Sequence, residues 1–331
     1  MQANTISKRT HRWAIGSYFF IAGITFASWA SRIPDIKEKL QLNDAELGGI
    51  LFALPAGSMV SLPISGWLVS KLGSRTVMLI AAIIYPILLL LLGTASTTFI
   101  LTSLLFCFGL LGNMMNISVN TQAVAVEELY GRSILASFHG IWSMAGFTGA
   151  AVGTLMISFG FDPLKHFSII AAAVILLALL MKFGRMPKDA VIGNQPLFVK
   201  PDKILLKLGL ISFCCMAAEG TMFDWSGIYF QKIVEAPPGL VTLGYSAFMC
   251  TMALGRFLGD GLVLRFGRKE ILQGSGIIIA IGLLIAVFIP TIVFATIGFL
   301  LVGFGVSSVV PIVYSQAGKS DKMSAGMALA A

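Results

Sequence analysis

Ten apolar segments, each long enough to cross a lipid bilayer, dominate this sequence of 331 residues. A membrane span needs about 20 apolar residues, and a helix satisfies all of its own backbone hydrogen bonds in hydrocarbon. The segments cover residues 13–31, 46–70, 77–94, 98–125, 136–160, 166–184, 205–231, 240–264, 270–289 and 292–317. An eleventh begins at Ser324 and continues to Ala331. The sequence therefore predicts an all-α membrane protein.

The composition excludes several other classes of protein. Hydrophobic residues make up 57% of the chain and charged residues only 11%, whereas soluble domains carry about 25% charged residues. The net charge of +8 comes from basic residues in short loops rather than from one basic surface, which argues against nucleic-acid binding. Cysteines and histidines show no metal-ligand spacing, and no Gly-rich nucleotide-binding motif or nucleophile motif occurs, so we expect neither a cofactor nor an enzymatic activity.

The basic residues predict how the chain is oriented in the membrane. If the N-terminus is cytoplasmic, 17 of the 23 Lys and Arg residues lie in inner loops, five lie in outer loops, and Arg256 lies within a span. An excess of Lys and Arg in cytoplasmic loops is the rule for membrane proteins. We therefore expect a multi-pass protein with a cytoplasmic N-terminus. The outer segment from Arg32 to Glu46 is expected to be a loop flanked by helix ends.

Two halves are predicted from a polar, proline-containing interval and an internal repeat. Residues 185–204 form a cytoplasmic linker between a six-helix half, residues 1–184, and a second half, residues 205–331. Gly73 corresponds to Gly267, Gly109 to Gly303 and Gln122 to Gln316, all with the same offset of 194 residues. Parallel repeats of this kind are common in secondary transporters. Because the first half ends near residue 184, its copy is expected to end near 378 (184 plus 194), and the chain is expected to be a truncated twelve-span protein.

The repeated loop resembles the cytoplasmic signature of the major facilitator superfamily. The matching residues are Gly66, Lys71, Gly73 and Arg75 in the first half and Arg265, Gly267, Arg268 and Lys269 in the second. The resemblance implies a structural and gating role for these residues. Ser70 and Leu264 stand where the signature has an acid, and losing that acid weakens the charge contact between helices that is attributed to the signature.

Longer segments are similar to a narrower branch, the bacterial inner-membrane proteins of the YbjJ type, which are related to fucose permeases. These segments are Ala27 to Asp35, Met115 to Gln122, Ser137 to Ser143 and Glu219 to Ser226. The resemblance implies a major facilitator fold and a monomeric, proton-linked carrier of small polar solutes of the sugar type. Asn116 stands where that branch often has Asp, so this position cannot titrate here.

Acidic residues inside the apolar segment 205–231 are the main candidates for proton coupling. Ionisable groups in a span are costly and usually face the bundle interior or a water-filled path. At 1.5 Å per residue, Glu219 lies roughly 18 Å from the cytoplasmic edge, and Arg256 on the next span is at similar depth. We expect the two to pair, with Glu219 either a proton site or half of a structural bridge. Asp224, farther out, is a second candidate.

Polar and aromatic residues of other spans complete the candidate site. Asn116 and Asn120 share one helical face with Asn113, and their amides suit a hydroxylated solute or simply join helices. Asp260 is four residues from Arg256, which favours a structural pair on one helix. The remaining candidates are His139 for proton exchange and Gln122, Trp29, Trp142 and Trp225 for solute contact. A satisfied structural histidine and interfacial tryptophans are the alternatives.

These observations predict a secondary active transporter that moves a small polar solute across the inner membrane with protons. Two alternatives stay open: a proton-antiport exporter of drugs or metabolites, and a non-transporting membrane sensor.

Overall fold

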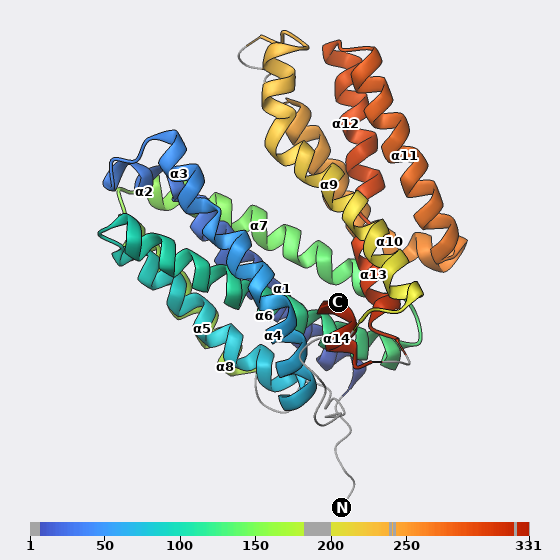
Figure 1. The fold of residues 1–331 in the computed structure, drawn as a ribbon, viewed down its shortest axis with the longest axis horizontal. Coiled ribbons are helices and arrows are strands. Elements are labelled where there is room, and N and C mark those ends of the chain that lie inside the picture. Colours follow the sequence, from blue (N-terminus) through green and yellow to red (C-terminus); the bar gives the residue numbers. More distant parts are fainter. Residues whose placement is uncertain (1–6, 182–199, 238–239, 241–242, 321–322, 331) are drawn as a thin grey trace, which may run out of the picture. The chain divides into compact units, whose positions relative to one another are not determined.

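The computed structural model describes residues 7–181, 200–237, 240, 243–320 and 323–330, and these residues form helices joined by short connections (Figure 1). Ten helices are long and apolar enough to cross a membrane, which confirms the predicted all-α membrane class. The interval predicted as a linker, residues 185–204, lies mostly outside the described residues.

The first half of the chain contains eight helices, six of which can span a membrane. They are α1 (Lys8–Ala30), α2 (Ile33–Lys39), α3 (Asp44–Leu51), α4 (Ala53–Leu72), α5 (Ser74–Thr94), α6 (Thr98–Tyr130), α7 (Leu135–Ser158) and α8 (Pro163–Met181).

The segment from Arg32 to Glu46, expected to be a loop, instead contains α2 and the start of α3. Pro34 lies in the first turn of α2, where its fixed φ favours a helix. Asn43 and Glu46 form a reciprocal capping box at the start of α3, with Glu46 N donating to Asn43 Oδ1 at 2.9 Å.

The second half contains α9 (Lys203–Lys232), α10 (Leu243–Phe266), α11 (Arg268–Phe288), α12 (Ile292–Val306), α13 (Val309–Ala317) and the short α14 (Ala325–Ala330). The span expected over 292–317 is confirmed as one membrane-capable segment, Ile292–Ala317, with a turn at residues 307–308 between α12 and α13. Pro311 has no N–H to donate to the Ser307 carbonyl four residues earlier, so one hydrogen bond of the helical ladder is missing at this turn.

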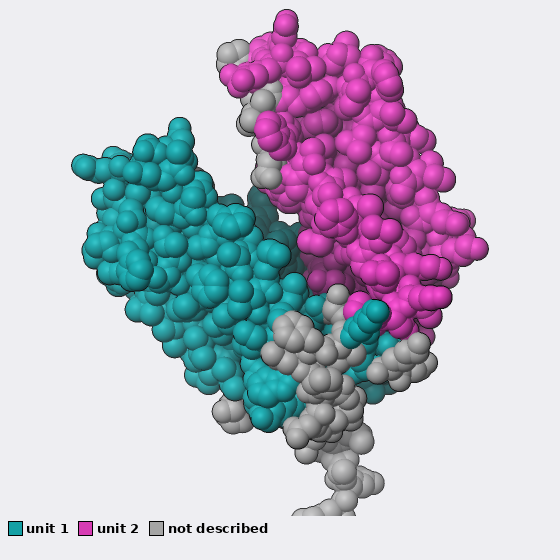
Figure 2. All heavy atoms as spheres, viewed as in Figure 1, with its two compact units in different colours: residues 1–129, 141–200, 318–331 teal, residues 130–140, 201–317 magenta. Residues whose placement is uncertain are grey.

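Contacts divide the chain into two compact units that are not simple halves of the sequence (Figure 2). The first unit comprises Met1–Leu129, Ile141–Lys200 and Gly318–Ala331, and the second comprises Tyr130–Gly140 and Pro201–Ala317. In the first unit, α5 packs along α8, and α14 packs on α4. In the second, α12 packs against both α10 and α11, and the start of α7 belongs to this unit.

The internal repeat is visible in the packing of the two units. A Cβ at Gly109 of α6 would overlap the Leu54 carbonyl of α4, and one at Gly303 of α12 would overlap the Phe248 carbonyl of α10. Leu54 and Phe248 are also 194 residues apart (248 minus 54). Gly73 and Gly267 adopt matching φ values of 83° and 91°, which only glycine adopts at little cost.

A polar contact follows the same repeat. Gln122 Nε2 donates to Ser74 Oγ at 2.8 Å, joining α6 to α5. With its amide oriented to satisfy both partners, Gln316 accepts from Arg268 Nε and Nη1 at 3.1 and 2.8 Å, joining α13 to α11. Ser74 and Arg268 are again 194 residues apart (268 minus 74), so the parallel repeat predicted from glycines and glutamines is confirmed.

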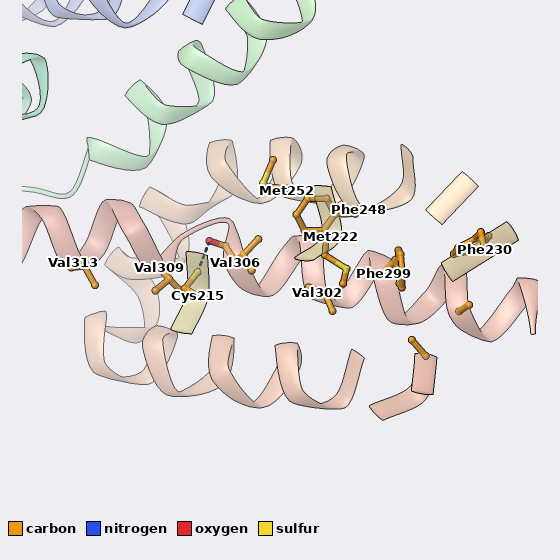
Figure 3. Close-up of a cluster of buried hydrophobic side chains, with 12 residues drawn as sticks. Cys215, Met222, Phe230, Phe248, Met252, Phe299, Val302, Val306, Val309 and Val313 are labelled. Carbon is orange, nitrogen blue, oxygen red and sulfur yellow. Dashed lines mark hydrogen bonds between the residues drawn. The ribbon is translucent and has the colours of Figure 1, made fainter. Parts of the chain in front are cut away.

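An apolar core holds the second unit together (Figure 3). Met222 and Phe230 of α9 meet Phe248 of α10 and Phe299 of α12, and all four are buried. Phe230 lies edge-on to Phe299 with ring centroids 5.4 Å apart, a geometry that aromatic pairs prefer. This core fixes the positions of α9, which carries Glu219, and of α10, which carries Arg256.

We predict that Gly109→Ala destabilises the first unit. The added methyl must push α6 away from the Leu54 carbonyl, and such overpacking typically costs about 1–3 kcal/mol. Gly146→Ala in α7 is the matched control, because no atom lies within 4 Å of its added Cβ. There the helix propensity of Ala should be neutral or stabilising by about 0.5–1 kcal/mol. Thermal unfolding of both variants in detergent measures the difference; equal midpoints would contradict the close crossing.

Candidate functional site

Glu219 of α9 and Arg256 of α10 form an ion pair inside the second unit, as their depths predicted. Arg256 Nη2 lies 3.4 Å from Glu219 Oε1, and the two side chains are 8% and 16% exposed. This distance exceeds the 2.7–2.9 Å typical of a strong charge-assisted hydrogen bond. The pair is therefore loose, and its two side chains are largely but not completely buried.

Other polar and sulfur groups lie close to this pair. Cys215 is one turn before Glu219 on α9, and its thiol is 3.8 Å from the Val306 carbonyl of α12 (Figure 3). His139, near the start of α7, interacts electrostatically with Arg256. The His139 ring lies edge-on to Tyr314 of α13, with centroids 6.1 Å apart. Glu219, Arg256 and His139 thus lie in one neighbourhood. Sequence spacing predicted the pairing of Glu219 with Arg256 but not the proximity of His139 to Arg256, and it did not identify Tyr314 as a neighbour of His139.

Two further candidates, Asp224 and Trp225, lie toward the end of α9. Asp224 lies in α9, but its side chain falls outside what the structure describes. Trp225 beside it is 60% exposed, as expected for a side chain in contact with lipid or its interface. The position of Asp224 as a second proton site stays a prediction.

Asp260 caps the start of α7. Its Oδ1 accepts from the Ala136 N–H at 3.1 Å and from Ser133 Oγ at 3.2 Å. Its Oδ2 accepts from the Ser137 N–H at 2.9 Å and from the Ser137 hydroxyl. A carboxylate at a helix N-terminus satisfies free N–H groups and complements the helix dipole. Sequence spacing suggested Arg256 as the partner of Asp260. The hydrogen bonds that Asp260 makes come instead from residues at the start of α7.

We predict that Asp260→Ala destabilises the second unit more than an ordinary capping mutation. Asp260→Ala removes four hydrogen bonds to buried or half-buried groups. The loss of one ordinary N-cap typically costs about 1 kcal/mol, so we expect a larger cost here. Asp162→Ala is the control, because Asp162 caps α8 through one exposed contact to the Lys165 N–H. Thermal unfolding in detergent should show the larger loss for Asp260→Ala, and the reverse order would contradict the cap.

The asparagine face of α6 lies in the first unit. Asn120 Nδ2 donates to the side-chain oxygen of Asn116 at 2.7 Å and to its carbonyl at 2.9 Å. Asn120 is buried, whereas Asn116 is half-buried. The Nδ2 atom of Asn113, one turn earlier, is buried and has no hydrogen-bond partner among the described residues. Asn116 and Asn113 are thus the members of this face with donor capacity left for another group.

The remaining predicted contact residues have different surroundings. Trp29 is buried within the first unit and lies 6.4 Å from Phe108, centroid to centroid, so it is a core residue and not part of an interfacial belt. Trp142 is half-buried on α7, where its backbone closely approaches Gly23 of α1. Gln122 joins α6 to α5 and is fully buried.

The signature residues lie at helix ends. Lys71 covers the ring of Trp67 at 4.6 Å, and Arg265 lies 5.2 Å from the ring of Phe266. Ser70, which replaces the usual acid, hydrogen-bonds to Ser324 ahead of α14. Gly66 closely contacts Met327 and Ala330 of α14. Lys269 is exposed in the first turn of α11.

A buried cluster around Arg32 was missed by sequence reasoning, which assigned Arg32 to an outer loop. Its side chain is 1% exposed. It donates to His166 Nδ1 at 3.1 Å, to the Phe161 carbonyl at 2.9 Å and to Asp35 at 3.1 Å. The only signal in the sequence was an arginine directly after an apolar span, which is ambiguous. Among the described residues no group of His, Cys, Asp or Glu could hold a metal ion.

Comparisons with known proteins agree with this architecture. An uncharacterized MFS-type transporter of Yersinia pestis is 36% identical over 94% of this chain and 81% of its own length. A Salmonella typhimurium protein, whose name provisionally assigns it the export of 2,3-dihydroxypropane-1-sulfonate, is 26% identical over 58% of this chain and 45% of its own. The crystal structure of FucP in its outward conformation has a TM-score of 0.73 and 18% identity, covering 96% of this chain and 85% of that one. FucP is a fucose:proton symporter of E. coli.

The sequence profile of the Major Facilitator Superfamily matches residues 14–331, which is nearly the whole chain. Ten membrane-capable helices, a parallel repeat and this match lead to one conclusion: the chain belongs to the Major Facilitator Superfamily of transporters.

Proposed function

We propose that this protein is a secondary active transporter of a small polar solute in the bacterial inner membrane, working by alternating access and coupled to protons through Glu219. The observation that carries the proposal is the loose, largely buried ion pair between Glu219 and Arg256 at 3.4 Å. An ionised carboxylate inside an apolar helix is energetically costly, and such groups usually mark an ion or substrate path.

The pair provides a chemical step that can be linked to transport. When Glu219 is ionised, it is attracted to Arg256 and α9 is held to α10. When Glu219 is protonated, this attraction is lost and the Arg256 guanidinium can exchange the carboxylate for another acceptor, such as a solute oxygen. Protonation of Glu219 and solute binding to Arg256 then favour each other. His139, in electrostatic contact with Arg256, is placed to sense this change.

On the first unit we assign solute recognition to Asn116, with Asn113 beside it. Their amides can donate and accept hydrogen bonds, which suits a polyhydroxylated solute. Asn120 acts on Asn116 by fixing its side-chain oxygen at 2.7 Å. Trp225, Asp224 and Trp142 remain candidate contacts, and we expect the protein to work as a monomer with a cytoplasmic N-terminus.

The test is solute-triggered proton movement in proteoliposomes containing a pH-sensitive dye. Sugars, polyols and amino sugars are added one at a time to wild type, Glu219→Gln and Glu128→Gln. Glu128→Gln is the control, because it makes the same chemical change at an exposed position of α6. We expect a pH change with at least one solute, at least tenfold smaller in Glu219→Gln and unchanged in Glu128→Gln. Unaltered proton movement in Glu219→Gln would refute the assignment.

Export by proton antiport is a second candidate, favoured by the similarity to the Salmonella protein named as a sulfonate exporter. In the same assay, an antiporter moves protons opposite to the solute, so the sign of the pH change separates the two modes. Including 2,3-dihydroxypropane-1-sulfonate in the panel tests an anionic polyol, for which Arg256 is a suitable counter-charge. Tight solute binding with no flux of either sign would instead indicate a sensor.

A further inference from the structure

A groove on the first unit lies between α5 and α8, which run side by side (Figure 1). Its volume is about 290 Å³. Its walls are apolar and consist of Leu79, Ile80, Ile83, Ala178 and Leu179. The floor offers no open polar group, because the Ala178 carbonyl already accepts a hydrogen bond from the Tyr18 hydroxyl at 2.9 Å. The groove therefore suits an alkyl chain and not a hydrated solute.

One end of this groove is cationic. Arg75 and Thr76 line it there, in the first turn of α5. Arg75 makes no ion pair or hydrogen bond with any described residue; it interacts only at longer range with Tyr18. In addition, α5 begins without a side-chain cap. Its first N–H groups and the positive end of its dipole thus add to the charge of Arg75, as in many anion sites.

The face of α5 that carries the groove is turned to the hydrocarbon. Ile80, Ile84 and Ile87 follow one another along this helix and are each about 40% exposed. Since α5 is a membrane-capable helix of 21 residues, we expect these exposed apolar side chains to face lipid. The cationic end lies at the start of α5, next to the connection predicted to be cytoplasmic, so we expect it near the lipid headgroups.

We propose that this groove binds an anionic phospholipid of the cytoplasmic leaflet. One acyl chain would lie along Leu79, Ile83 and Leu179, and the phosphate would meet Arg75 and the first turn of α5. Charge complementarity selects this occupant: a zwitterionic lipid would compensate the charge of Arg75 less well, and a free anion would leave the apolar groove unused. Basic pockets between helices on the cytoplasmic side bind anionic headgroups in other membrane proteins.

Native mass spectrometry of the whole chain tests this proposal. The protein is released from detergent containing equal amounts of dioleoyl phosphatidylglycerol and dioleoyl phosphatidylcholine, which share their acyl chains. We expect preferential retention of phosphatidylglycerol. Arg75→Gln should lower its occupancy about fivefold, corresponding to about 1 kcal/mol per basic residue, without changing phosphatidylcholine. Ile83→Trp fills the groove and should lower the retention of both lipids.

Lys269→Gln is the matched control, because Lys269 is the repeat partner of Arg75 in the first turn of α11 and loses the same charge. Equal losses in Lys269→Gln and Arg75→Gln would overturn the proposal in favour of a general charge effect. Full retention in Arg75→Gln, or displacement of the lipid by inorganic phosphate alone, would also overturn it. If Arg75→Gln does not fold, Arg75→Lys replaces it and should retain most of the lipid preference.

Discussion

Replacing Arg32 by methionine is expected to cause a large loss of stability in the first unit. Arg32 is the largest of the fully buried side chains, and its guanidinium joins four segments: the end of α1, α2, the connection before α8, and α8 itself. Methionine fills a similar volume but leaves the Phe161 carbonyl and Asp35 without this donor. Breaking a buried charged network typically costs about 3–5 kcal/mol.

The geometry of guanidinium explains why no other side chain should substitute. Nε, Nη1 and Nη2 of Arg32 each donate to a different acceptor: His166, Asp35 and Phe161. Arg32→Lys keeps the charge but has a single ammonium at one point, so it should recover only part of the lost stability.

Thermal unfolding in detergent, followed by loss of helical circular dichroism, measures these effects. Lys37→Met is the control, because Lys37 pairs with the exposed Asp44, and exposed ion pairs contribute little. We expect an almost unchanged midpoint for Lys37→Met, a large decrease for Arg32→Met and an intermediate value for Arg32→Lys. A midpoint for Arg32→Met equal to that of wild type would mean that the buried network does not stabilise the unit.

Replacing Arg256 by methionine is the second change with a large expected effect. It leaves Glu219 within the helices without its cation, and removing one partner of a buried pair costs about 3–5 kcal/mol. Lowering the pH should recover stability in this variant, because protonation neutralises the remaining carboxylate. Wild type should show no such gain, since protonation there breaks the pair with Arg256.

A double-mutant cycle separates the pair from its surroundings. Glu219→Gln/Arg256→Met removes both charges and should be clearly more stable than Arg256→Met alone, with a coupling energy of about 1–3 kcal/mol. Stability and solute-driven proton movement are measured on the same preparations. If the double variant folds well but does not couple protons, the pair acts in transport and not only as a bridge. Additive losses of stability would show that the two charges do not interact.

The proposed roles of Glu219 and Arg256 and the stability predictions rest on different contacts. The hydrogen bonds of Arg32 and Asp260 secure helix ends in their respective units and are made to residues other than Glu219 and Arg256. A loss of transport in Arg32→Met would therefore be attributed to folding, whereas a loss in Glu219→Gln at wild-type stability would be attributed to coupling.

Much of the architecture follows from local sequence properties. The lengths of the apolar runs determined the ten spanning helices, because a bilayer requires about 20 apolar residues per helix. Equal spacing of Gly73 and Gly267, and of Gly109 and Gly303, revealed the repeat, because glycine is needed wherever backbones cross closely or φ is positive. Counting residues along α9 and α10 was sufficient to place Glu219 beside Arg256, because the rise of a helix is constant.

The tertiary structure decided which residues meet across the sequence. Spacing suggested Arg256 as the partner of Asp260, but the carboxylate accepts hydrogen bonds from the start of α7, more than 120 residues away. The sequence predicted that Arg32 lies in an outer loop, but its side chain is buried and donates hydrogen bonds to His166 and to the Phe161 carbonyl. The start of α7 belongs to the second compact unit, and α14 belongs to the first. The length of an apolar run is a local property, so the sequence alone predicts each spanning helix. The partner of a buried charge depends instead on which helix ends are brought together by packing, and no local pattern in the sequence carries that information.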